Sequence, residues 1–242
     1  YKSCVSMKNL IIQYYDQKLP KWGEISRKMF EQYAAKHGAE YEYYDKLEFC
    51  PEVPYFENLN LVYNDRFLCY NNILYVDVDV IPENMEENIF DEADFIEDIG
   101  MVPECKPNGM NADPFHLLPN VEYQFRKACF NFGCPVRMAT RGPAPYLILN
   151  SGVILWTKQG RMKARKRFMY WKDWYDGVEM SQLKLDQPFI TSQVTKCLKY
   201  EEMDLKWNAY PAFRFHEGMI PKERNFIHYT GGKKKFIEEL YA

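Results

Sequence analysis

The segment 73–80 (ILYVDVDV) constrains this chain more than any other. Its apolar residues are too continuous for an exposed hairpin strand and too few for a buried helix, so it predicts a central strand of a mostly parallel sheet. Pro82 ends the strand, because proline cannot donate to the ladder. Alternate strand residues face the same way, so the carboxylates of Asp77 and Asp79 are expected together on one face at the end of this strand.

Two like charges in a dry site repel each other, which predicts a cation between Asp77 and Asp79. Oxygen ligands favour a hard divalent ion such as Mg²⁺ or Mn²⁺. A structural role remains the alternative, with one carboxylate in solvent and the other paired to a basic side chain. The apolar flanks of the triplet and a candidate third ligand downstream favour the metal site.

Strands alternate with helices along the chain, which predicts an α/β fold with a doubly wound sheet. Residue periodicity indicates the other elements, which are strands over 9–12, 39–44 and 146–156 and helices over 25–34, 56–70, 160–175 and 181–195. Seven prolines interrupt the pattern within 103–146. That stretch is expected to be irregular, with one short helix near 121–129, and long irregular segments are usually functional.

Composition excludes several classes of protein. With 47 % apolar residues in 242, the chain can bury a sizeable core, and its net charge of −3 gives no electrostatic case for binding nucleic acid. Seven scattered cysteines without a CxxC pair indicate a reducing compartment, such as the cytoplasm, rather than a disulfide framework. No apolar stretch approaches the roughly 20 residues of a membrane span. The chain begins at Tyr1, so an upstream membrane anchor stays open as an expectation.

Four segments together resemble the GT-A glycosyltransferases of family 8, the group of glycogenin and the lipopolysaccharide galactosyltransferases. They are 74–80 (LYVDVDV), 149–153 (LNSGV), 185–187 (LDQ) and 227–234 (IHYTGGKK). The resemblance implies a Rossmann-like, mostly parallel central sheet flanked by helices, in a single catalytic domain over 1–242. Residues 1–102 would bind nucleotide and metal, 103–146 would form an acceptor-side insertion, and 147–242 would hold the donor sugar, the acceptor and a C-terminal metal and phosphate segment.

The resemblance also implies a metal site of Asp77, Asp79 and His228. An imidazole ligand suits Mn²⁺ better than Mg²⁺, which remains possible. The residues implied in binding the nucleotide sugar are Tyr14, Tyr15, Asp16, Arg66, Gly231, Gly232 and Lys234. Taken singly, each has a plain structural alternative, namely a core histidine, a loop tyrosine or a solvated lysine tail.

Asp186, Gln187 and Asn150 are the catalytic candidates that the resemblance implies. Asp186 would bond sugar hydroxyls and Gln187 would stand near the anomeric carbon, although an acidic residue before Pro188 is also an ordinary helix start. Asn150 would lie beside the donor sugar or the acceptor, or in a plain turn. A neutral amide is a poor nucleophile, so a front-face reaction with retention is favoured over a stable glycosyl-enzyme.

The expected function is metal-dependent transfer of a hexose or similar sugar from a UDP-sugar to a hydroxyl of a carbohydrate or glycoconjugate. A sugar-phosphate nucleotidyltransferase is one alternative, but residues 13–18 (QYYDQK) lack the glycine-rich loop of that class. An inactive carbohydrate-binding module is the other. The basic run 161–167 is expected to be a solvated helix face, and contact with an anionic membrane surface is the second possibility.

Overall fold

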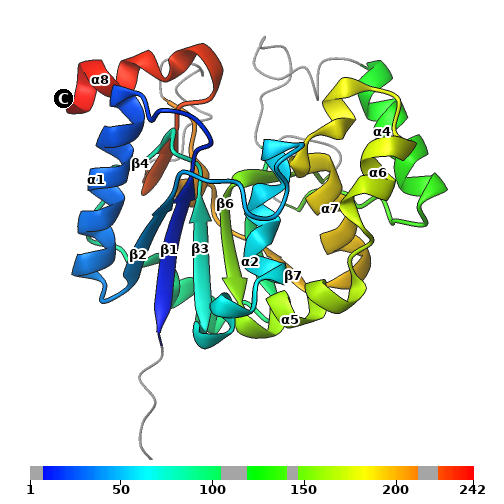
Figure 1. Cartoon of the computed structure of the whole chain (residues 1–242), viewed down its shortest axis with the longest axis horizontal. Coiled ribbons are helices and arrows are strands. Elements are labelled where there is room, and N and C mark those ends of the chain that lie inside the picture. The colour runs from blue at the N-terminus through cyan, green and yellow to red at the C-terminus, as the bar shows by residue number, and fades with distance from the viewer. Residues whose placement is uncertain (1–7, 105–118, 141–146, 212–222) are drawn as a thin grey trace, which may run out of the picture.

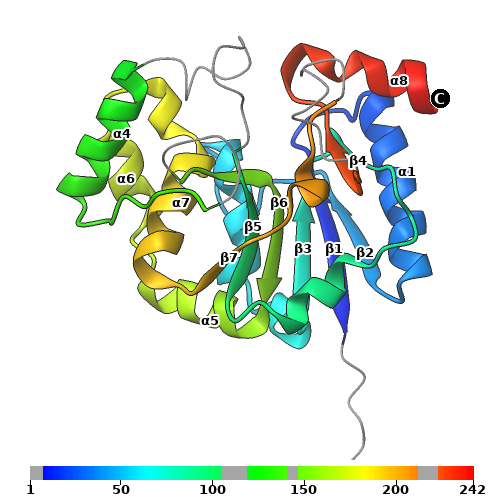
Figure 2. The same cartoon turned by 180° about the vertical axis from the view of Figure 1, so that it is seen from behind.

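The computed structural model describes residues 8–104, 119–140, 147–211 and 223–242. Its main sheet has six strands in the order β2-β1-β3-β6-β5-β7 (Figures 1 and 2). Five of them run in one direction and β6 runs against both of its neighbours, so the prediction of a mostly parallel sheet is confirmed. The strands are β1 (Asn9–Tyr14), β2 (Glu40–Tyr44), β3 (Asn72–Val76), β5 (Ile99–Pro103), β6 (Leu149–Thr157) and β7 (Tyr200–Glu202).

Helices cover both faces of this sheet. In Figure 1, α1 and α8 lie on one side of the sheet and α4 to α7 on the other. The helices are α1 (Lys21–Lys36), α2 (Asn60–Tyr63), α4 (Pro119–Asn131), α5 (Lys158–Arg167), α6 (Trp171–Gly177), α7 (Asp186–Cys197) and α8 (Lys235–Tyr241). Helix α4 covers the short helix expected at 121–129, whereas 105–118 and 141–146 of that irregular stretch lie outside the described residues.

Two-sided burial explains the apolar runs of the strands. Leu10 and Ile12 of β1 belong to the core cluster under α7, whereas Ile11 packs with Phe30 and Tyr33 of α1 in the cluster on the opposite face. Successive side chains of a strand point to opposite faces, so a strand that is covered on both sides is apolar throughout. The nine residues of β6 are all buried for the same reason.

A second, two-stranded sheet lies beside the first. Strand β4 (Val80–Pro82) pairs antiparallel with β8 (Phe226–His228), and Val80 is the partner of His228. Two short segments from far apart in the sequence are thereby joined next to the end of β3. This pairing matters more for the site than any helix does.

Three expected helices are interrupted. The helix expected over 56–70 is a 3-10 helix (Pro54–Leu59), the short α2, and a second 3-10 helix (Asp65–Cys69), because Asn64 leaves the helical conformation and its side chain caps Arg66 N. The helix expected over 160–175 is two helices, α5 and α6. Phe168 between them is extended and packs between Trp156 and Phe189. The helix expected over 181–195 is a 3-10 helix (Ser181–Lys184) followed by α7, because Leu185 is extended.

Two further findings bear on the expected compartment. Within the described part of the chain, no helix combines the length and apolarity that a membrane crossing requires. The five cysteines in the same part of the chain are free thiols.

Candidate active site

The acidic pair lies in a turn, not on the strand where the sequence predicts it. Strand β3 ends at Val76, and Val80 N donates to Asp77 O at 3.1 Å to close the turn. Asp77 N still bonds Gly152 O of β6 at 2.9 Å, but the chain then leaves the sheet to pair with β8. The two carboxylates come together because of the turn rather than because of strand periodicity.

Three elements hold this turn in place through its carbonyl groups. Gln13 of β1 donates its side-chain amide to Asp77 O at 3.2 Å, and Ser26 of α1 donates its hydroxyl to Val80 O at 2.6 Å. Tyr229 N donates to Asp79 O at 2.8 Å from the residue after β8. Gln13 and Ser26 are completely buried, so the turn is anchored to the core.

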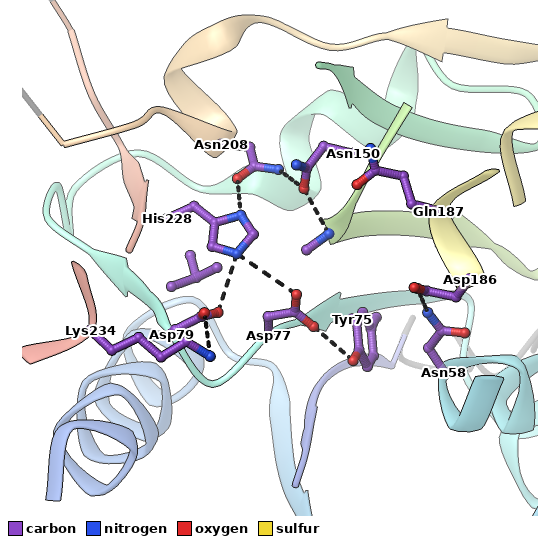
Figure 3. Close-up of polar contacts among 12 residues, drawn as sticks. Asn58, Tyr75, Asp77, Asp79, Asn150, Asp186, Gln187, Asn208, His228 and Lys234 are labelled. Carbon is purple, nitrogen blue, oxygen red and sulfur yellow. Dashed lines mark hydrogen bonds and ion pairs between the residues drawn. The ribbon is translucent and has the colours of Figure 1, made fainter. Parts of the chain in front are cut away.

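The β4–β8 pairing brings His228 to the acidic pair. His228 Nε2 lies 3.2 Å from Asp79 Oδ1 and 3.8 Å from Asp77 Oδ2 (Figure 3). One ligand atom from each of the three residues lies within 4.8 Å of the others, and no other such group of His, Cys, Asp or Glu is found in the described residues. Two carboxylate oxygens and one imidazole nitrogen are a donor set that fits a divalent cation such as Mn²⁺.

Gly152 of β6 makes room for the imidazole ring. A Cβ atom at this position would lie 2.3 Å from His228 Cε1 and 2.7 Å from Nδ1. Real Cβ atoms do not approach other heavy atoms this closely. The glycine of the 149–153 segment is therefore required by the histidine of the 227–234 segment.

Lys234 supplies positive charge on the other side of Asp79. Its Nζ lies 2.9 Å from Asp79 Oδ2 and its side chain crosses the Trp22 ring, 4.8 Å from the ring centre. Burial by itself raises the pKa of Asp79, but His228 and Lys234 more than offset this, so the net pKa is lowered. Burial, and then repulsion by Asp79, raise the pKa of Asp77. For His228, the adjacent carboxylates outweigh burial and raise the pKa.

Two cavities meet at this cluster. One of about 220 Å³ is lined by Tyr14, Tyr15, Asp16 and Lys234. The other, of about 560 Å³, is lined by Glu104, Asn150, Gln187, Tyr210, His228 and Gly231. Five residues line both, namely Tyr55, Asp77, Asp79, Ser151 and Asp186. The carboxylate cluster therefore lies where a ligand extending from one cavity into the other would pass.

No protein-family model matches the sequence, and no curated protein matches it either. Comparison of the structure with solved structures does find similar folds, and the three described next are at most 15 % identical in sequence. One is a glycosyltransferase involved in the glycosylation of the major capsid of PBCV-1 (TM-score 0.53, 15 % identity, 96 % of this chain and 99 % of that one). Another is galactosyltransferase LgtC in complex with donor and acceptor sugar analogues (TM-score 0.55, 13 % identity, 95 % and 94 %). A third is mouse xyloside xylosyltransferase 1 (TM-score 0.55, 13 % identity, 93 % and 98 %).

This chain has the GT-A fold. Within the GT-A fold, the structure brings together the candidates from all four sequence segments around Asp77 and Asp79. Gly232 is the exception among them, and Arg66, a candidate outside these segments, likewise lines neither cavity. The Arg66 guanidinium pairs with Glu42 at 2.8 Å and lies over the rings of Tyr44 and Phe67.

Asp186 is the first residue of α7 and lines both cavities. Asn58 donates its amide to Asp186 Oδ2 at 2.6 Å (Figure 3), and Ser151 also bonds this carboxylate. Burial raises the pKa of Asp186 to about 6, although these hydrogen bonds act in the opposite direction. Among the described residues, its hydrogen bond at 2.6 Å thus comes from a neutral amide rather than from a basic side chain.

Sequence reasoning missed several polar residues of this GT-A site, Glu104 and Asn208 above all. Glu104 follows β5 directly, is 1 % exposed, and accepts hydrogen bonds from Asn150, Gln187 and Tyr210. The sequence does contain a signal for Glu104, because this acidic residue follows an apolar strand directly, as Asp77 does. Asn208 has no such signal, since it lies in a 3-10 helix (Leu205–Asn208) without a motif.

The basic run 161–167 is not a uniformly solvated face. Arg161 is 1 % exposed and donates to the carbonyls of Trp156, Phe67 and Tyr70. Within the same run, Lys163 pairs with Asp98 at 2.7 Å and Arg165 pairs with Asp65. Arg165, Lys166 and Arg167 are exposed, as expected for a solvated helix face, whereas the burial of Arg161 departs from that expectation.

Proposed function

We propose that this protein is a metal-dependent glycosyltransferase that moves a hexose or similar sugar from a UDP-sugar to a hydroxyl group of a carbohydrate or glycoconjugate acceptor. The observation that carries the proposal is the cluster of Asp77, Asp79 and His228 at the junction of two cavities in a GT-A fold. A likeness to LgtC, which was solved with donor and acceptor sugar analogues, supports the same assignment.

The donor set supports a divalent ion, with Mn²⁺ favoured by the imidazole and Mg²⁺ as the second choice. Such an ion, when bound, supplies positive charge to the diphosphate that leaves the sugar. Asp77, Asp79 and His228 would hold it. Tyr229 N fixes the main chain at Asp79 through its carbonyl oxygen. Burial raises the pKa of the Asp79 carboxyl, but His228 and then Lys234 lower it by more, so the carboxylate is ionised before any ligand arrives.

The smaller cavity suits the nucleotide. Tyr14 and Tyr15 offer aromatic faces for a uracil ring, and Asp16 offers a carboxylate that accepts a hydrogen bond from a base N–H. Lys234 lies between this cavity and the cluster, where its ammonium can bind a phosphate oxygen. Gly231, in the left-handed region at φ 61°, lets the adjacent backbone approach the same phosphates. Arg66 and Gly232 stay predictions, because neither lines the cavities.

The larger cavity suits the donor sugar and the acceptor. Asp186 would accept hydrogen bonds from sugar hydroxyls, and Asn150 and Gln187 line the same space. We infer retention, because the amide of Gln187 is a poor nucleophile. The acceptor oxygen would bond to the anomeric carbon on the face from which the diphosphate departs. The bond to the diphosphate breaks with its electron pair, and the acceptor proton passes to the leaving phosphate oxygen.

The test is turnover of a panel of UDP-sugars with and without Mn²⁺ or Mg²⁺. We expect metal-dependent release of UDP, and no release from Asp79→Asn. The matched control is Asp94→Asn, an exposed carboxylate in the 3-10 helix Ile89–Asp94, which should keep wild-type turnover. Proton NMR of the product would show the same anomer as the donor.

Two outcomes separate the alternatives. Release of pyrophosphate from UTP and a sugar phosphate would assign a nucleotidyltransferase. Binding of sugar without turnover, equal with and without metal, would assign an inactive carbohydrate-binding module. The division into halves, the reducing compartment and contact of the 161–167 run with a membrane stay predictions that this assay does not address.

A further inference from the structure

A continuous row of hydrogen bonds joins the metal-site histidine to the residue proposed to lie beneath the donor sugar. It runs from His228 through Asn208, Asn150 and Glu104 to Gln187. The first four of these residues are each at most 6 % exposed. Figure 3 shows the part of the row from His228 to Asn150. Water therefore does not compete for these bonds, and each donor must meet an acceptor.

The orientation of the Asn150 amide is fixed at both of its ends. Gly152 N–H is a backbone donor and lies 2.8 Å from Asn150 Oδ1, so this atom must be the oxygen. Asn150 Nδ2 lies 2.8 Å from Glu104 Oε2, and a carboxylate accepts only, so this atom must be the nitrogen. The two assignments are independent and agree.

Asn208 transmits this orientation to the histidine. Its Nδ2 donates to Asn150 Oδ1 at 2.8 Å, so its own Oδ1 must face His228 Nδ1, which lies 3.1 Å away. An oxygen there requires that His228 Nδ1 carries the hydrogen when the ring is neutral. In the metal-free protein Nε2 faces the carboxylates of Asp77 and Asp79, which only accept, so this nitrogen carries a hydrogen as well. A bound cation would take the place of that hydrogen, and the lone pair of Nε2 would then point to the metal while Nδ1 keeps its hydrogen. This is the tautomer that a metal ligand needs.

At the other end of the row, Glu104 orients Gln187. The Nε2 atom of Gln187 donates to Glu104 Oε2 at 3.0 Å. With the nitrogen engaged, the carbonyl oxygen of Gln187 is the end of the amide left for the cavity that the side chain lines. Tyr210 donates its hydroxyl to the second oxygen of Glu104, which holds the carboxylate itself in place.

We propose that Asn208 and Glu104 are positioning residues, Asn208 setting the tautomer of His228 and Glu104 setting which end of the Gln187 amide faces the donor sugar. The second half rests on the proposed sugar transfer, whereas the first half needs only a divalent cation at Asp77, Asp79 and His228. Neither residue belongs to the sequence segments that indicate the active site.

The tautomer is read by ¹⁵N NMR of the histidine rings with saturating Mg²⁺, a diamagnetic ion that would take the place of the hydrogen on Nε2. His228 is assigned from the signal lost in His228→Gln. We expect wild-type His228 to be protonated on Nδ1. Asn208→Leu removes the acceptor and should give a mixture of tautomers, with Mn²⁺ bound about 10- to 100-fold more weakly in a calorimetric titration.

Two control variants test whether the loss of the Asn208 oxygen causes the change at His228. Asn208→Asp retains an oxygen opposite His228 and should keep the Nδ1–H tautomer. Asn72→Leu replaces a partly buried asparagine whose side chain donates to Asn9 at the opposite end of β3, and should leave His228 unchanged. A wild-type ring protonated on Nε2, or an Asn208→Leu variant with wild-type tautomer and affinity, would overturn the role of Asn208.

The role of Glu104 toward Gln187 is tested with Glu104→Gln. This substitution keeps the shape of the side chain but replaces one hydrogen-bond acceptor by a donor. We expect the side-chain amide signals of Gln187, assigned with Gln187→Leu, to shift, with Mn²⁺ affinity within about twofold of wild type because Gly152 N–H still orients Asn150. With a UDP-sugar that the wild-type protein turns over, the kcat of Glu104→Gln should be about tenfold lower and its KM little changed. Unmoved Gln187 signals would overturn the role of Glu104. Moved signals without any UDP-sugar turnover would instead refute the proposed function.

Discussion

Replacing Gly152 by alanine tests whether the close approach of β6 to His228 holds the metal site together. The backbone at this position is not in the left-handed region, so alanine adds no conformational strain there. The added Cβ would lie 2.3 Å from His228 Cε1, 2.7 Å from Nδ1 and 3.1 Å from Asn150 Oδ1. The whole perturbation is thus a collision between one methyl group and the imidazole ring.

The size of the effect follows from these distances. Carbon atoms in ordinary contact are about 3.5–4.0 Å apart, so the ring must retreat by about 1 Å or more. His228 is held by Asp79 at 3.2 Å and by Asn208 at 3.1 Å, and a retreat of this size breaks one of these contacts. Overpacking of this kind costs about 1–3 kcal/mol of stability. Misplacing a ligand should weaken metal binding about 10- to 100-fold.

Isothermal titration of Mn²⁺ into the purified protein, with thermal unfolding alongside, measures both effects. Gly232→Ala is the matched control, since its Cβ would meet nothing within 4 Å, and it should keep wild-type Mn²⁺ affinity and stability. If Gly152→Ala binds Mn²⁺ as tightly as the wild type does, His228 is not a ligand or the ring tolerates the displacement. Either result refutes the argument from close packing.

Three other predictions concern stability. Arg161→Met removes the guanidinium donors from the carbonyls of Trp156, Phe67 and Tyr70, of which Phe67 O keeps the Tyr70 N–H, and should lower the free energy of unfolding in urea by about 2–5 kcal/mol. The exposed Lys166→Met should cost about 0.5 kcal/mol or less, and equal losses would contradict the capping role. Because the pKa of Asp186 is about 6 when folded against 3.8 as its ordinary value, wild-type stability declines as the pH rises through 6. Asp186→Asn should therefore raise the melting temperature at pH 8 and not below pH 4, and a gain of equal size at both would disprove the linkage. Gly160→Ala puts a Cβ 1.8 Å from the backbone oxygen of Asp98 and should cost about 3 kcal/mol or more, read from the same urea titration; wild-type stability would show that the backbone yields there.

Local pattern was sufficient for much of the fold. The apolar run that contains Tyr75 and Val76 predicts a strand buried on two faces, and residue periodicity predicts α1 with its end at Gly38, which is in the left-handed region at φ 66°. These features depend on which neighbours in the sequence are apolar or lack a side chain. The four segments around Asp77, Asn150, Asp186 and His228 indicated one site only through their joint resemblance to the motifs of GT-A glycosyltransferases.

Only the tertiary structure decided how that site is built. The turn after Val76 exists because Val80 pairs with His228, a contact between residues far apart in the chain that no periodicity records. Arg161 is a charged side chain that is nevertheless buried, because carbonyls from β6 and from the segment 67–70 converge on it. The roles of Glu104 and Asn208 arise the same way. The sequence determines which residues are apolar or charged, but the partners of a polar group are set by the folded path of the chain, and these partners determine its chemistry.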